Sequence, residues 1–133
     1  MREVTLDTLT PVALTVDRQA ILVYAEITGD FNPIHVDPEF AATTPLGGVI
    51  AHGTLSLNLI WQSLAATFGS AALRGAAIDI RFSKPVREGD IVEAGGRRSA
   101  DAPGRFDVWV KNRDGIAVIE GTATLSATKE KEA

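Results

Sequence analysis

Residues 54–68 read TLSLNLIWQSLAATF, and they contain no charged side chain, no proline and no glycine. The stretch has the length of a helix, and its apolar residues fall on every side of a helical wheel. A helix that is hydrophobic all round has to be covered by another element. The region without charge is longer still, because residues 40–73 contain no Asp, Glu, Lys or Arg. We therefore predict that this segment lies inside the protein.

The sequence after residue 73 has the two-residue period of β-strands and supplies the cover. Apolar and polar side chains alternate at 78–82 and 106–111, residues 117–125 are rich in β formers, and 91–98 is a weaker run. Turn-forming residues separate these runs, at 84–85, 88–90, 102–104 and 114–115. The pattern predicts four consecutive strands in an antiparallel meander, which an early strand within 4–15 could join.

A curved antiparallel sheet around one long apolar helix is an α+β architecture, and it fits the hot-dog fold. A chain of 133 residues is enough for one domain with one core, so we expect a single domain over 1–133. Residues 128–133 read as a solvated tail. Such a sheet leaves an edge strand that a second copy could pair with, so we expect a homodimer or a dimer of dimers.

Composition excludes several classes of function. The chain has no cysteine, which excludes disulfides, thiolate nucleophiles and Cys-ligated zinc. Its net charge of −4 argues against a nucleic-acid partner. Only residues 74–113 are positive, with nine basic and six acidic side chains, a pattern more typical of exposed strand faces than of an anion site. Neither a signal peptide nor a spanning helix is evident, so we expect a soluble, cytoplasmic protein without a membrane partner.

Two helices are predicted ahead of the charge-free segment, and the link between them is polar. Asp17 can cap a helix over 17–28 that ends at Gly29, and Asp37-Pro38-Glu39 starts a second helix. Between them lie Asp30 and His35, which a continuous helix would place about 140° apart. Gly29 and a proline after Asn32 instead predict a folded-back loop, which could aim both side chains into one space. The alternative is an interhelical turn whose polar groups bond only to nearby backbone.

Three functional hypotheses compete with that alternative. A metal site could use His35, Asp37 and His52, although Asp37 is already explained as a helix cap. Nucleophilic catalysis lacks a cysteine and a Gly-x-Ser-x-Gly elbow. General acid–base catalysis could use Asp30 with His35, and the N–H of Gly53, at the start of the apolar helix, could stabilise an enolate oxygen.

The sequence resembles the MaoC-like (R)-specific enoyl-CoA hydratases over essentially its whole length. The similarity lies in YAEITGDFNPIH, residues 24–35, in IAHG, residues 50–53, and in FSKPVREGD, residues 82–90. This resemblance implies that Asp30 and His35 form a dyad that activates a water, that Asn32 shapes the site and that Gly53 binds the thioester oxygen. The implied reaction is syn hydration of a trans-2-enoyl-CoA to the (R)-3-hydroxyacyl-CoA, in fatty-acid or polyhydroxyalkanoate metabolism, with no cofactor and no metal.

Substrate contacts are the least constrained part of this prediction. Where some family members have a small polar residue, the central helix has Trp61, which could shorten the acyl pocket or could simply belong to the core. His52 is expected to line the pocket or to have a structural role. Lys84 and Arg87 are candidates for contacting CoA phosphates, with 97–98 as an equal alternative. Competing functions are a dehydratase of a branched, dicarboxylic or carrier-protein-bound acyl thioester, a thioesterase, and a non-catalytic acyl-binding subunit.

Overall fold

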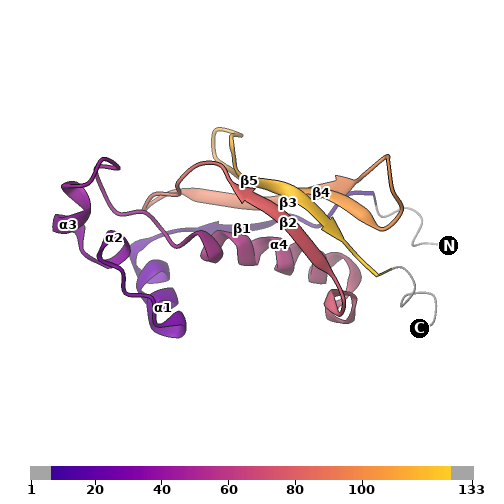
Figure 1. The fold of residues 1–133 in the computed structure, drawn as a ribbon, viewed down its shortest axis with the longest axis horizontal. Coiled ribbons are helices and arrows are strands. Elements are labelled where there is room, and N and C mark those ends of the chain that lie inside the picture. Colours follow the sequence, from indigo (N-terminus) through magenta and orange to yellow (C-terminus); the bar gives the residue numbers. More distant parts are fainter. Residues whose placement is uncertain (1–6, 127–133) are drawn as a thin grey trace.

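The computed structural model of the chain describes residues 7–126. A five-stranded antiparallel sheet lies over one long helix, and three shorter helices gather at one end of the molecule (Figure 1). This arrangement confirms the predicted α+β architecture. The elements are, in chain order, β1 (Val12–Thr15), α1 (Arg18–Thr28), α2 (Pro33–Val36), α3 (Pro38–Ala42), α4 (Gly53–Phe68), the 3₁₀ helix η2 (Ser70–Leu73), β2 (Ala77–Phe82), β3 (Ile91–Arg98), β4 (Arg105–Asn112) and β5 (Ala117–Thr124).

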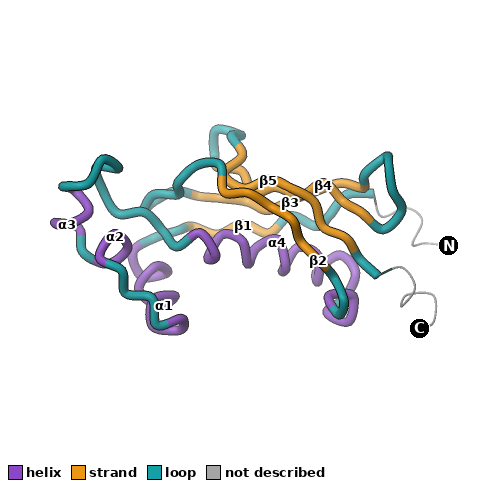
Figure 2. The backbone as a smooth tube through the Cα atoms, viewed as in Figure 1, coloured by secondary structure: helices purple, strands orange, loops and turns teal. Residues whose placement is uncertain are grey.

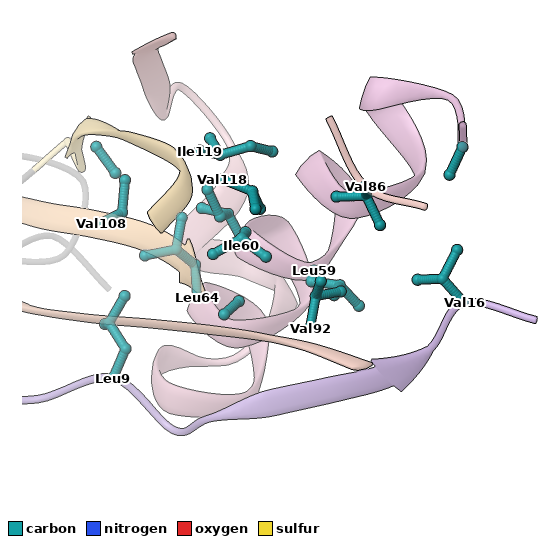
Figure 3. Packing of buried hydrophobic residues seen from close by; sticks show 14 of the residues in the cluster. Leu9, Val16, Leu59, Ile60, Leu64, Val86, Val92, Val108, Val118 and Ile119 are labelled. Atoms are coloured by element: carbon teal, nitrogen blue, oxygen red, sulfur yellow. The ribbon is translucent and has the colours of Figure 1, made fainter. Parts of the chain in front are cut away.

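Helix α4 is the predicted central helix, and one of its faces is buried against the sheet. That face consists of Ser56, Leu59, Ile60, Ser63 and Leu64, at the three- and four-residue spacing of one helical side. Leu59, Ile60 and Leu64 belong to a single core cluster with valines and isoleucines of the strands (Figure 3).

The expectation that 40–73 lies wholly inside is wrong. Trp61, Leu57 and Leu55 on α4 are only partly buried, and the Phe40 side chain is 46% exposed. The reason is geometric, because a single sheet can cover only one side of a helix.

The strand order corrects the predicted meander. All four predicted strands and the early one are present, but the order across the sheet is β1-β3-β4-β5-β2. Strands β3, β4 and β5 form a consecutive meander, whereas β2 pairs with β5 and not with β3. The eight residues 83–90 therefore cross the end of the sheet instead of making a tight hairpin (Figure 2). Residues 4–6 of the predicted early strand and the predicted tail, 128–133, lie outside the described residues.

The β2–β3 connection is tied to the segment that leads into α4. The N–H of Ala51 donates to the carbonyl of Val86 at 2.8 Å, and Ile50 forms an isolated antiparallel bridge with Arg87. Ser83 continues the pairing of β2 with β5, because its N–H donates to Val118 at 2.8 Å. These bonds hold the connection over the N-terminus of α4.

The two predicted flanking helices are confirmed, with their caps. Asp17 accepts a hydrogen bond from the N–H of Ala20, and Gly29 ends α1 in the left-handed region, with φ 75°. Asp37 caps α3 by accepting the N–H groups of Glu39 and Phe40.

The link between these helices differs from the predicted loop, because it contains the single-turn helix α2. Asn32 caps that turn, since its Oδ1 accepts from the N–H of Ile34 at 3.1 Å, and Pro33 occupies the first helical position.

Within residues 7–126, no helix has both the length and the apolarity needed to cross a membrane.

Candidate active site

Asp30 lies at the start of the link, directly after the glycine that ends α1. One of its carboxylate oxygens accepts the N–H of Asn32 at 3.2 Å, which makes a local turn. The other carboxylate oxygen has no hydrogen-bond partner among residues 7–126, and the side chain is exposed. One half of the carboxylate therefore holds the backbone, and the other half is open to a ligand.

His35 lies on α2 and is oriented by a backbone carbonyl. Its Nδ1 is 2.7 Å from the carbonyl oxygen of Ile50. Because a carbonyl oxygen only accepts, Nδ1 carries the proton, and in the neutral ring Nε2 is the nitrogen that can take one up. The ring is partly buried. This arrangement is suited to a histidine that exchanges a proton through Nε2.

His52, the residue before α4, is buried beside these two groups and is 3% exposed. Its Nε2–H donates to the carbonyl oxygen of Asp30 at 3.0 Å. Its ring stacks on that of His35, with 3.9 Å between the ring centroids, and Tyr24 meets it edge-on at 5.1 Å. The Tyr24 hydroxyl in turn donates to Thr54 at 2.7 Å. His52 thus connects the link to the start of α4.

Asp30, His35 and His52 each have a potential ligand atom, and these atoms lie within 4.8 Å of one another. The stacked rings nevertheless do not suit a shared metal ion. Their planes are inclined by only 27°. Since the lone pair of an imidazole nitrogen lies in the ring plane, two nearly parallel stacked rings cannot both direct a lone pair at one ion. Asp37 of the sequence-based metal hypothesis is occupied as the cap of α3.

Gly53 is the first residue of α4, where the helix has no side-chain cap. The first N–H groups of a helix have no intrahelical partner, and the helix dipole favours negative charge beside them. An added Cβ at this position would lie 2.8 Å from Cε1 of Phe82, so the ring would have to move to admit a side chain. The N-terminus of α4 therefore combines free backbone donors with close approach of an aromatic ring.

A cavity of about 300 Å³ opens beside His35 and Gly53. Most of its other lining residues are apolar, and they come from the segment before α4, from the end of β2, from the β2–β3 connection and from β5. The polar exceptions are Ser56, one turn into α4, and Ser83 and Lys84 in the connection. A mostly apolar cavity with a few polar groups is typical of a site for a small organic ligand.

The structure brings together only some of the predicted site residues. Asp30, His35, His52 and Gly53 lie around the start of α4, and Lys84 lines the cavity. Arg87 does not line it, and its guanidinium donates to the carbonyl of Leu46 at 2.7 Å.

Two further predicted site residues, Trp61 and Asn32, have structural roles in this fold. Trp61 is partly buried against the core cluster and does not line the cavity. Asn32 caps α2, which uses its side-chain oxygen.

Sequence reasoning missed Ser56 and Phe82 as cavity residues. Ser56 carried a usable signal, because it is a polar residue three positions after Gly53 in a helix that is otherwise mainly apolar. Phe82 had no such signal, since it lies 29 positions after Gly53 and approaches it only through the folding of β2.

Comparison with known proteins identifies the family. Residues 3–130 match the model of the MaoC-like domain. A 3-hydroxybutyryl-CoA dehydratase from Methylorubrum extorquens is 34% identical over 85% of this chain and 74% of its own length. An (R)-specific enoyl-CoA hydratase from Rhodospirillum rubrum is 32% identical over 85% of this chain and 81% of its own length.

Solved structures agree with the family match. The R-hydratase PhaJ1 from Pseudomonas aeruginosa superposes with a TM-score of 0.75 at 28% identity, covering 87% of this chain and 77% of its own. An (R)-hydratase from A. caviae involved in PHA biosynthesis gives 0.74 at 26% identity, covering 92% and 97%. The sheet lying over one central helix is the hot-dog fold of these hydratases. The chain belongs to the MaoC-like dehydratase family, whose relatives named above are hydro-lyases.

Proposed function

We propose that this protein is an (R)-specific enoyl-CoA hydratase, which adds water reversibly to a trans-2-enoyl-CoA to give the (R)-3-hydroxyacyl-CoA. The observation that carries the proposal is the grouping of Asp30 and His35 beside the N-terminus of α4, which has no side-chain cap, and beside an apolar cavity. A carboxylate oxygen of Asp30 and a ring nitrogen of His35 lie within 4.8 Å of each other. A carboxylate and an imidazole can divide the acceptance and donation of protons in such a site.

The proposed reaction assigns a task to each group. The thioester oxygen accepts the Gly53 N–H, which stabilises the negative charge that develops on the enolate. The oxygen of a water forms a bond to C3 while the C2=C3 π bond breaks and its electrons move toward the thioester oxygen, and one proton of the water passes to the Asp30–His35 dyad. The dyad returns a proton to C2 on the same face, so the two groups act as a coupled pair. On the histidine, Nε2 exchanges the proton because Nδ1 is committed to the carbonyl of Ile50.

The acyl chain is proposed to be short. Gly53 and Ser56 are the residues that α4 contributes to the cavity lining, and the buried residues of the next helical turn are Leu59 and Ile60, which belong to the core. The cavity volume of about 300 Å³ is at the lower end of the range for ligand sites. A relative that is named for a four-carbon substrate supports the same conclusion. Chain length is therefore limited by the core beneath α4, and Trp61 has no part in it.

Lys84 is the proposed contact for the phosphates of CoA. It lines the cavity, and its side-chain ammonium has no hydrogen bond or ion pair with another residue in the range 7–126. An unpaired ammonium group beside the cavity suits a phosphate. Arg87 can contribute less to this contact, because its guanidinium already bonds to Leu46.

A homodimer is proposed, formed by pairing of two β2 strands. β2 is at the edge of the sheet and pairs with β5 alone within residues 7–126. The Phe82 side chain at its end is 54% exposed although it is apolar and lies against the candidate site. Pairing two such edges would satisfy the free backbone groups and cover the phenylalanine.

The decisive experiment follows the absorbance of the conjugated enoyl thioester when purified protein is added. We expect loss of absorbance with crotonyl-CoA and much slower loss with octenoyl-CoA. Prior treatment with a chelator should leave the rate unchanged. If both substrates are inert, the assignment as a short- or medium-chain hydratase fails.

A further inference from the structure

Ser56 has a buried hydroxyl with no partner. The residue is 1% exposed, and its Oγ has no hydrogen-bond partner in the described part of the chain. Buried polar side chains are nearly always hydrogen-bonded, and leaving one unpaired costs folding free energy. The residue lines the same cavity as His35 and Gly53, where most of the lining is apolar. A polar group of a bound ligand could supply the hydrogen-bond partner that this hydroxyl lacks.

A second buried serine on the same helix provides the comparison. Ser63 is fully buried, and its hydroxyl donates to the carbonyl oxygen of Thr10 at 2.5 Å. It is seven residues, about two helical turns, beyond Ser56 and does not line the cavity. Helix α4 thus has one buried serine that serves the fold and another that faces the candidate site without a partner.

The position of Ser56 defines which substrate atom it can reach. It is three residues after Gly53, which corresponds to about 4.5 Å along the helix axis. If the thioester carbonyl is held at Gly53 and the acyl chain follows the helix, an extended chain advances about 1.25 Å per bond, so the level of Ser56 is three to four bonds away. Helical side chains lean toward the N-terminus, which brings the hydroxyl to about three bonds from the carbonyl. The atom beside the hydroxyl is then C4 of the acyl chain. One turn further along α4, Leu59 and Ile60 belong to the buried core.

We propose that Ser56 selects short acyl thioesters that carry an oxygen substituent at C4, through a hydrogen bond between its hydroxyl and that oxygen. The inference rests on the proposed function for the identity of the ligand as an acyl thioester. It goes beyond that function by naming a class of substrate, the C4-oxygenated acyl groups, and the residue that recognises them. An unsubstituted four-carbon chain leaves the hydroxyl unpaired, whereas a C4 oxygen satisfies it.

Binding of saturated thioesters tests the inference without any catalytic step. Butyryl-CoA and 4-hydroxybutyryl-CoA differ by one oxygen at C4, and neither can be hydrated. Isothermal titration calorimetry would compare their affinities for the wild type and for Ser56→Ala, Ser56→Cys and Ser63→Ala. We expect the wild type to bind the hydroxylated form about tenfold more tightly, as one well-formed hydrogen bond allows. Ser56→Ala should abolish that preference and Ser63→Ala should retain it. Ser56→Cys, of similar volume and weaker hydrogen bonding, should show an intermediate preference.

The outcomes separate this inference from the proposed function. Equal affinities of the wild type for the two thioesters, as a trapped water on Ser56 would produce, overturn the inference. So does a preference that persists in Ser56→Ala. If the preference is found but crotonyl-CoA is not hydrated, the proposed function fails and the inference stands. If crotonyl-CoA is hydrated and the preference is absent, the function stands and the inference fails. Binding of neither thioester contradicts both.

Discussion

Asp30 and His35 each use one side-chain atom in a local hydrogen bond and keep another that has no partner in residues 7–126. Asp30 uses one carboxylate oxygen in a turn, and His35 uses Nδ1 on the carbonyl of Ile50. We expect Asp30→Asn and His35→Gln each to lower kcat for crotonyl-CoA by about 10² or more, since general acid–base groups typically contribute that much. Steady-state kinetics of the purified variants would measure the loss.

The local hydrogen bonds supply the control for these variants. An asparagine at position 30 can still accept the N–H of Asn32, so the turn should survive. Circular dichroism spectra and melting temperatures should therefore stay close to those of the wild type. Near-full activity in either variant would remove that residue from the site.

His52 is expected to act as a positioning residue, because its donor group and its ring contact different partners. The Nε2–H bonds to the Asp30 carbonyl, and the ring stacks on His35. His52→Gln retains a donor and loses the ring, whereas His52→Phe retains a ring and leaves the carbonyl unpaired. We expect His52→Phe to have the lower kcat, by about tenfold or more, because small displacements of a catalytic carboxylate are costly.

Measurement of kcat and KM for both His52 variants tests this prediction. A positioning role predicts that the difference between them appears in kcat, with KM for crotonyl-CoA similar. If the two variants lose activity equally and melt at equally reduced temperatures, His52 has a purely structural role.

At the level of single residues, the sequence predicted which side chains are special better than what they contact. The helix stop at Gly29 and the proline at 33 were enough to indicate that Asp30 and His35 do not continue helix α1. The bond from His52 to the Asp30 carbonyl spans 22 positions and depends on the packing of α4 against the link. Sequence spacing contains no information on such a contact. For the same reason, the sequence could not distinguish Lys84 from Arg87 as a candidate for contacting the CoA phosphates.

Helix α4 carries a prediction about stability that needs no substrate. Ser63→Ala removes a hydrogen bond and leaves the Thr10 carbonyl with one partner fewer, which costs about 1 kcal/mol. Ser56→Ala removes a hydroxyl that has no partner, so its free energy of unfolding should be unchanged or higher. Thermal unfolding should show a melting temperature lowered by a few degrees for Ser63→Ala alone. A comparable decrease in Ser56→Ala would mean that this hydroxyl is bonded in the folded protein.

The elements themselves were well predicted, and so was the antiparallel pairing of β3, β4 and β5, but the place of β2 in the sheet was not. Periods of two and of three to four residues located four of the strands and the long helices, because each period reflects which side chains face the core, whereas β1 was expected only somewhere within 4–15. The order of the strands depends on where β2 finds a partner, which no local pattern encodes. The connection 83–90 contains turn residues, but it is long enough to cross the end of the sheet. The single turn of α2 was also missed, since four residues are too few to show a period.

The whole molecule is expected to be a dimer whose subunits pair along β2. Ser83 bonds to Val118 across the β2–β5 pair, so by alternation the N–H of Ile80 points away from β5, toward the free edge. Ile80→Pro removes that donor while keeping the bonds between β2 and β5. Sedimentation equilibrium should give about twice the 14.1 kDa chain mass for the wild type and a lower mass for Ile80→Pro.

Ile80→Ala is the matched control, because it shortens the same side chain and keeps the backbone donor. It should remain dimeric. A wild-type protein that sediments as a monomer, or an Ile80→Pro variant as dimeric as Ile80→Ala, would contradict pairing through this edge.

The crossing connection at 83–90 also has a consequence for folding kinetics. Strands β3, β4 and β5 are neighbours in the chain and can pair early, because short loops are closed at little entropic cost. The candidate site instead requires two contacts over long separations, that of His52 with Asp30 and that of Ala51 with Val86. In a Trp61→Phe variant, the fluorescence of Trp109 on β4 should report the formation of the sheet. Hydratase activity should return more slowly than that signal, so the last step of refolding would be the one that makes the enzyme competent.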